Sequence, residues 1–69
     1  MNRKEHLEWA KQRCFEYLDN GDLQRAIVSF MRDMSKHNDL KDHIGLQLMS
    51  IYTYSNNIIE FKEFINGFN

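Results

Sequence analysis

The sequence predicts an all-α fold, a compact bundle of four short helices that is built on an αα-hairpin and self-associates. Apolar residues recur at helical spacing almost from end to end, and the 69 residues include no proline. The break at Asn20-Gly21-Asp22 separates two helical patterns, and so short a link requires the helices to pack antiparallel. We expect one domain, residues 1–69, with helices at about 3–18, 23–36, 40–53 and 58–66.

The first expected helix places its tryptophan away from its core stripe. That stripe follows the i, i+3, i+4, i+7 rule and consists of Leu7, Ala10, Cys14, Tyr17 and Leu18. Trp9 points nearly the opposite way, on the side of Arg13. Because exposed aromatic residues are enriched at binding hot spots, Trp9 and Arg13 are candidate partner contacts. Alternatively, the C-terminal segment covers Trp9, or the indole lies half exposed over the Arg13 stem.

The second expected helix follows a glycine stop and an aspartate cap. Gly21 can adopt the left-handed conformation that ends a helix, and Asp22 can accept a hydrogen bond from the next first turn. The apolar face consists of Leu23, Ala26, Ile27, Phe30, Met31 and Met34. The opposite face carries Arg25, Ser29, Arg32 and Lys36. This line of three cations and a hydroxyl is either a binding site for phosphates or an acidic partner, or simply a solvated face.

The third expected helix begins at about Leu40, with Asp39 as its N-cap. Its apolar residues spread around most of the helical wheel, so we expect it to be central or to lie at a subunit interface. Gly45 in its middle costs about 1 kcal/mol relative to alanine, which is tolerable where another group approaches closely. In the last helix Asn57 is the expected cap, Gly67 the stop, and Phe68 folds back onto the bundle.

Composition argues against several classes of function. The formal net charge of -1 gives no bulk attraction to nucleic acid or to an acidic membrane, and no apolar run is long enough to span a bilayer. Cys14 is the only cysteine and lies on the core stripe, which predicts a buried thiol in a reducing compartment. The sequence contains no phosphate-binding glycine loop, paired cysteine motif or zinc motif. We therefore predict a soluble protein that is not an enzyme and has no metal or cofactor.

Two resemblances extend this interpretation. The pattern Tyr17…Gly21-Asp22…Ala26…Phe30 resembles the turn and second helix of a tetratricopeptide repeat, but no second copy follows. Three longer segments resemble a family of small uncharacterised proteins encoded by tailed bacteriophages and prophages. They are HLEWAKQRCFEYLDNGDLQRA, MSKHNDLKDHIGLQL and FKEFINGFN. The chain departs from the family pattern at SIYTYSNN, near the last loop.

The phage resemblance implies an accessory protein that acts in the host bacterial cytoplasm. Such a protein would bind and inhibit a host factor, for example an antiviral defence component, without catalysis. One alternative is a sponge for a nucleotide-like defence signal in a pocket between subunits, with Arg25, Arg32 and Lys36 on the phosphates and Trp9 or a tyrosine on the base. Another is a structural virion or assembly protein. The expected partners are a second copy in a homodimer and a host protein, with neither membrane nor nucleic acid.

Overall fold

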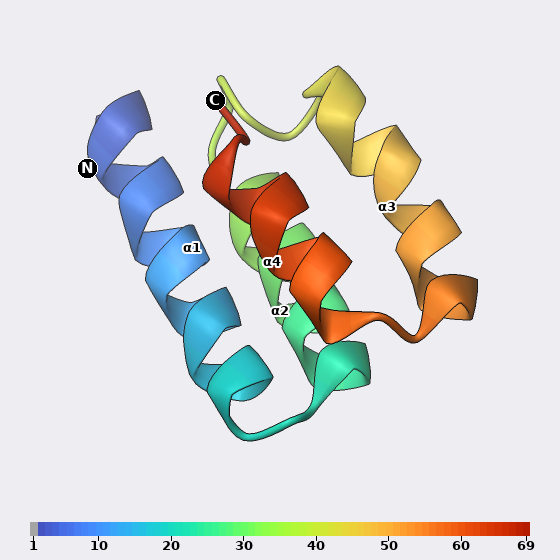
Figure 1. Ribbon diagram of the computed structural model, residues 1–69. Helices are drawn as coiled ribbons and strands as arrows, with labels where there is room; N and C mark the ends of the chain where they lie inside the picture. The colour runs from blue at the N-terminus through green and yellow to red at the C-terminus, as the bar shows by residue number, and fades with distance from the viewer. Residues whose placement is uncertain (1) are drawn as a thin grey trace.

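Four α-helices make up the computed structural model, which describes residues 2–69 (Figure 1). The helices are α1 (Arg3–Asp19), α2 (Leu23–Ser35), α3 (Ile44–Ser55) and α4 (Ile58–Asn66). The predicted all-α bundle is confirmed, and no strand forms within residues 2–69. α1 and α2 form the antiparallel hairpin, α4 packs beside α1, and α3 lies at the far side of the molecule from α1 (Figure 1).

Local caps define the hairpin. At the start of α1, the Asn2 side chain accepts a hydrogen bond from the Glu5 N–H at 2.8 Å, and the Glu5 carboxylate accepts one from the Asn2 N–H at 3.2 Å. Gly21 follows α1 with φ of 75°, a conformation that a residue with a Cβ adopts only at a cost. Asp22 then caps α2 by accepting from the Arg25 N–H at 3.0 Å. The predicted glycine stop and aspartate cap are both confirmed.

The core lies between the hairpin and α4 and is completed by the last apolar residue of the chain. Phe30, Phe61 and Ile65 are fully buried, and Phe68 is 4% exposed. The Phe68 ring meets Phe30 edge to face, with centroids 5.1 Å apart. The predicted return of Phe68 to the bundle is therefore confirmed. The buried apolar residues are Leu7, Ala10, Cys14, Leu18, Leu23, Ala26, Ile27, Phe30, Met34, Leu40, Met49, Phe61, Ile65 and Phe68.

The third helix begins four residues later than predicted, at Ile44 rather than Leu40. Residues 37–43 form successive turns instead, in which the Leu40 N–H bonds to the His37 carbonyl at 3.0 Å. Asp39 is not the N-cap; His43 is, because its Nδ1 accepts from the Gly45 N–H at 2.9 Å. The turns carry the Leu40 side chain into the core, where it is fully buried, and this burial favours the loop over another helical turn.

The position of α3 also corrects the sequence prediction, because this helix is peripheral. Only Gly45 and Met49 are buried along it. Ile44 is 73% exposed, Ile51 62% and Tyr54 89%. The prediction that α3 is buried within the single chain is wrong, while the alternative that it lies at a subunit interface stays a prediction. Met31, placed on the α2 core face by periodicity, is likewise exposed.

Gly45 lies where the C-terminal segment crosses α3. A Cβ at this position would lie 2.5 Å from Cε2 and 2.8 Å from Cζ of Phe68. The close approach predicted at Gly45 is confirmed, and the Phe68 ring makes it, but Gly45 lies in the first turn of α3 and not in the middle of the helix. The His43 ring also packs against Phe68, with centroids 4.3 Å apart, so the glycine, the cap and the C-terminus form one contact.

Gly45→Ala should lower the free energy of unfolding by about 1–3 kcal/mol, because overpacking outweighs the better helix propensity of alanine. Urea denaturation followed by circular dichroism measures this. Gly67→Ala is the matched control, since the nearest atom to its new Cβ lies 3.7 Å away. In a Phe68→Leu background the cost of Gly45→Ala should shrink. A Gly45→Ala protein as stable as the parent would show that the Phe68 contact does not require glycine.

Candidate functional site

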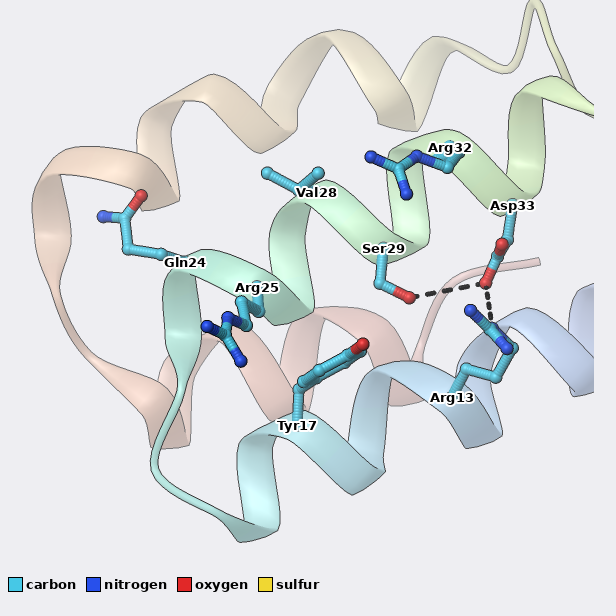
Figure 2. Close-up of a pocket in the computed structure, with 8 residues that line it drawn as sticks. All are labelled: Arg13, Tyr17, Gln24, Arg25, Val28, Ser29, Arg32 and Asp33. Atoms are coloured by element: carbon cyan, nitrogen blue, oxygen red, sulfur yellow. Dashed lines mark hydrogen bonds and ion pairs between the residues drawn. The ribbon is translucent and has the colours of Figure 1, made fainter.

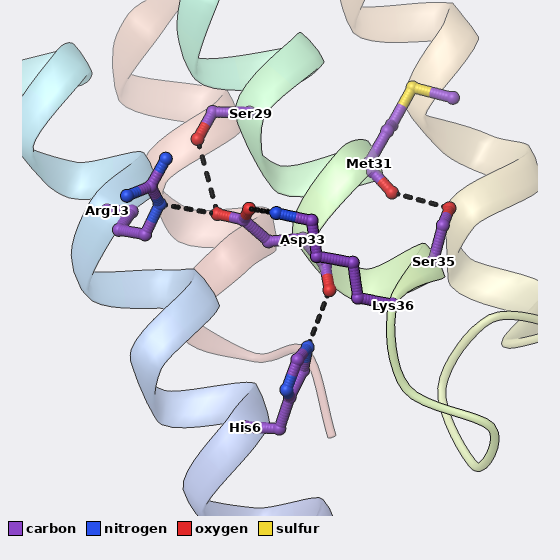
Figure 3. A network of polar contacts seen from close by, with 7 residues as sticks. All are labelled: His6, Arg13, Ser29, Met31, Asp33, Ser35 and Lys36. Atoms are coloured by element: carbon purple, nitrogen blue, oxygen red, sulfur yellow. Dashed lines mark hydrogen bonds and ion pairs between the residues drawn. The ribbon is translucent and has the colours of Figure 1, made fainter.

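A fully buried carboxylate lies between α1 and α2. Asp33 of α2 accepts a hydrogen bond at Oδ2 from Nε of Arg13 on α1, at 2.7 Å, and from the Ser29 hydroxyl at 3.4 Å (Figure 3). Its other oxygen, Oδ1, lies 3.6 Å from Nζ of Lys36, which is an ion pair but not a hydrogen bond. We call Asp33, Arg13, Ser29 and Lys36 the Asp33 cluster. It combines a buried anion with two cations whose side chains remain about half exposed.

The backbone of Asp33 makes a second link to α1. Its carbonyl accepts a hydrogen bond from Nε2 of His6, a residue that is 8% exposed (Figure 3). A carbonyl oxygen can only accept a hydrogen bond, so the nitrogen of His6 that carries the proton in this contact is Nε2. Together, the His6 and Arg13 contacts attach two turns of α1 to one residue of α2.

Trp9 is half-buried and lies next to the two cations of the Asp33 cluster, Arg13 and Lys36. The Arg13 guanidinium lies 5.1 Å from the indole centroid, and the Lys36 ammonium 5.8 Å. The His6 ring lies 5.1 Å away on the same helix. Both cations are within the range of cation–π attraction. This arrangement corresponds to the half-exposed alternative for Trp9 next to Arg13.

A hollow of about 300 Å³ lies on the opposite flank of Arg13, between α1 and α2 (Figure 2). We call it the arginine cavity, and its lining residues are Arg13, Tyr17, Gln24, Arg25, Val28, Ser29, Arg32 and Asp33. Three guanidinium groups and one carboxylate give this lining a formal charge of +2, whereas the whole chain carries -1. The positive charge is therefore locally concentrated. A larger hollow near α3 includes both Lys41 and Asp42, whose charges oppose each other.

The arginines of the cavity differ in how they are held. Arg25 pairs with Asp22 at 3.4 Å but is 77% exposed. Arg32 is exposed and forms no ion pair with any residue from 2 to 69. Arg13 makes the shortest contact of the three, because its Nε–H donates at 2.7 Å to the fully buried Asp33 carboxylate. Its two terminal amino groups are not used in that bond.

The predicted line on α2 is divided between two sites. Arg25, Ser29 and Arg32 do line one cavity, and Arg13 joins them from α1. Lys36 does not line it and lies over Trp9 instead. The interpretation of Ser29 as part of a solvated face is wrong, because Ser29 is only 8% exposed. Its hydroxyl turns inward because the buried Asp33 offers an acceptor.

Sequence reasoning missed Asp33 and Tyr17 as site residues. Asp33 falls seven residues after Ala26 and three after Phe30, so helical periodicity places it on the buried stripe. It also follows Ser29 by four residues, the spacing at which side chains on a helix meet. A charged residue in a buried register indicates a partner on a neighbouring helix. Tyr17 was assigned to the core, yet it is half-buried and borders the cavity.

The remaining candidate reactive groups are the Cys14 thiol and the potential metal ligands. Cys14 is fully buried, as predicted, and burial together with the nearby Asp33 charge raises the pKa of its thiol to about 12. The thiol therefore stays protonated at neutral pH and is a poor nucleophile. Within residues 2–69, no group of three or more histidine, cysteine, aspartate or glutamate side chains converges as metal ligands would.

No family model, curated protein or solved structure matches the chain. Across the part of the chain that the structure describes, none of the helices has the length and apolar character needed to cross a membrane. Functional interpretation of the site therefore depends on its own geometry.

Arg13→Ala should lower the free energy of unfolding by about 2–3 kcal/mol, because it leaves a buried carboxylate without its strongest donor. Asp33→Asn should cost less, about 1 kcal/mol, because the Arg13 charge that remains is half exposed and stays solvated. Urea denaturation at pH 7 compares the two. Arg32→Ala, which breaks no ion pair with residues 2–69, should stay within about 0.5 kcal/mol of the parent. A larger loss for Asp33→Asn than for Arg13→Ala would contradict this account.

Proposed function

We propose that this chain is a non-enzymatic accessory protein of a tailed bacteriophage or prophage that binds and inhibits a host protein in the bacterial cytoplasm. An antiviral defence component is the kind of target that we propose. The resemblance of three sequence segments to a phage family supports the setting. The observation that carries the host-binding role is the half-buried Trp9 indole, which lies 5.1 Å from the Arg13 guanidinium. The exposed apolar surface of α3 supports the self-association that we propose beside it.

The α3 face is a regular helical stripe. Ile44, Leu48 and Ile51 recur at i, i+4 and i+7, and they are 73%, 48% and 62% exposed. Tyr54, at 89% exposed, extends the surface toward the end of the helix. No residue of α3 carries a formal charge. Contiguous apolar surface on a soluble domain marks contact with another molecule.

We propose that a second copy of the chain covers the α3 face. In a two-fold dimer each surface meets itself, so a charged face would meet a like charge in its partner. The uncharged α3 face avoids this repulsion. Two α3 helices related by such an axis can pack antiparallel, which also places their dipoles in opposition. Self-association supplies apolar burial that a domain of 69 residues lacks by itself.

The host protein is then proposed to bind at the surface around Trp9. Tryptophan and arginine are the residues most enriched at binding hot spots, and here Trp9 and Arg13 lie against each other. Lys36 and His37 extend this surface at the end of α2, since the His37 ring lies 5.1 Å from that of His6. A partly buried indole held by neighbours loses little freedom on binding, which favours affinity.

Ile51→Lys should convert the dimer to a monomer, because the two-fold axis would bring two new ammonium groups together in an apolar interface. Light scattering coupled to size exclusion measures the mass, which should fall by half. Ser50→Lys is the matched control, since it adds the same charge to an exposed position beside the stripe and should leave the dimer intact. A parent protein that is monomeric at about 100 µM would contradict the dimer, since specific dimers reach micromolar affinity.

Trp9→Ala should abolish capture of one host protein from bacterial lysate, because truncating a hot-spot residue costs 2 kcal/mol or more, about 30-fold in affinity. Quantitative mass spectrometry of tagged bait compares the parent with Trp9→Ala. Arg3→Ala, which removes an exposed arginine at the first position of α1, is the control. A melting curve verifies that Trp9→Ala is folded. Equal capture by parent and Trp9→Ala would contradict the proposed surface, and abundance in purified virions would favour a structural role.

A further inference from the structure

We propose that the arginine cavity is a binding site for the phosphate group of a small phosphate monoester, about the size of a mononucleotide. The site lies within one chain, between α1 and α2, and none of its lining residues belongs to the α3 face. It is therefore separate from the proposed dimer face, and it shares only Arg13 with the host-protein surface proposed around Trp9. It also differs from a pocket between subunits, because Lys36 and Trp9 are not part of it.

Charge is the first argument for an anion. Arg13, Arg25 and Arg32 converge on the cavity from two helices, and the one carboxylate among them is already compensated by Arg13 and Lys36 (Figure 2). A protein with net charge -1 has no general reason to gather three guanidinium groups around a hollow. Arg25 is partly offset by Asp22 at 3.4 Å, but Arg32 forms no ion pair with residues 2–69, so a bound dianion would give its charge a partner.

The geometry of Arg13 is the second argument. Asp33 holds its Nε at 2.7 Å, so the guanidinium is positioned without the use of its terminal amino groups. A planar guanidinium donates in pairs, and phosphate oxygens accept in pairs, which makes arginine the preferred residue for this ligand. Because Asp33 is fully buried and bonded to Ser29, the arginine is already ordered before a ligand arrives. Asp33 is thus a positioning residue that does not itself contact the phosphate.

The rest of the lining limits the size and character of the ligand. The cavity of about 300 Å³ is at the small end of ligand sites, and it holds a phosphate with a body of one ring system. Tyr17 projects from α1 between Arg25 and Arg13, and Val28 offers an apolar side chain that is 52% exposed (Figure 2). An aromatic and an aliphatic side chain beside three arginines suit a base or sugar attached to the phosphate.

The test is a heteronuclear NMR titration of the full chain with inorganic phosphate, adenosine monophosphate and adenosine. The buffer contains about 150 mM NaCl, because salt at this concentration screens unspecific electrostatic attraction. Phosphate and the monophosphate should shift the amides of α1 and α2 around the cavity in a saturable way, and adenosine should not. Absence of saturation with either phosphate compound up to about 10 mM would overturn the proposal, as would equal binding of adenosine.

Variants separate the cavity from the general surface. Arg32→Ala and Arg25→Ala should each weaken binding of the monophosphate by about tenfold or more, since each removes a charge-assisted contact. Arg3→Ala removes an arginine outside the cavity and should change the affinity less than about twofold. Equal losses in all three variants would show unspecific attraction and overturn the site. Host-protein capture, which depends on Trp9, should remain in Arg32→Ala, so the two proposals can fail separately.

Discussion

The buried Asp33 carboxylate is the constraint on which the rest of this structure depends. A charge removed from water is costly unless donors replace its hydration, so Arg13 of α1 must lie beside Asp33 of α2. This pairing defines the register of the hairpin, and the His6 contact to the Asp33 carbonyl repeats the same link nearer the start of α1. It also sets both candidate surfaces, because Arg13 lines the cavity on one flank and covers Trp9 on the other.

The chain length explains why α3 is left at the edge. Most of the core is supplied by the hairpin and α4, together with Leu40 from the loop and Phe68 from the C-terminus. α3 attaches to this core through Gly45, Met49 and the partly buried Leu46 and Tyr52. Its other apolar residues stay exposed, since no surface formed by residues 2–69 covers them. A small domain with more apolar side chains than interior is one that gains stability from association.

Much of the fold could be predicted from sequence because local rules determine it. The hairpin turn, the Asp22 cap and the bounds of α4 depend on residues that are adjacent in the chain. The start of α3 could not, because it depends on burial of Leu40 by distant residues and on an imidazole cap at His43. The same distinction holds at the site. Arg25 and Arg32 were found by spacing along one helix, whereas the role of Asp33 requires knowledge of which residue faces it on α1.

Arg13 also links the two proposed activities through one side chain. Its guanidinium lies 5.1 Å from the Trp9 ring while its Nε is bonded to Asp33, so it borders both the partner surface and the cavity. A bound phosphate would compete with the indole face for the same cation, and the indole would lose a neighbour as the cavity filled. By linkage, a partner that orders Arg13 over Trp9 would change phosphate affinity by the same factor that phosphate changes partner affinity. The two proposed binding events would therefore be coupled through one guanidinium group, although Trp9 belongs to the partner surface alone and Arg32 to the cavity alone.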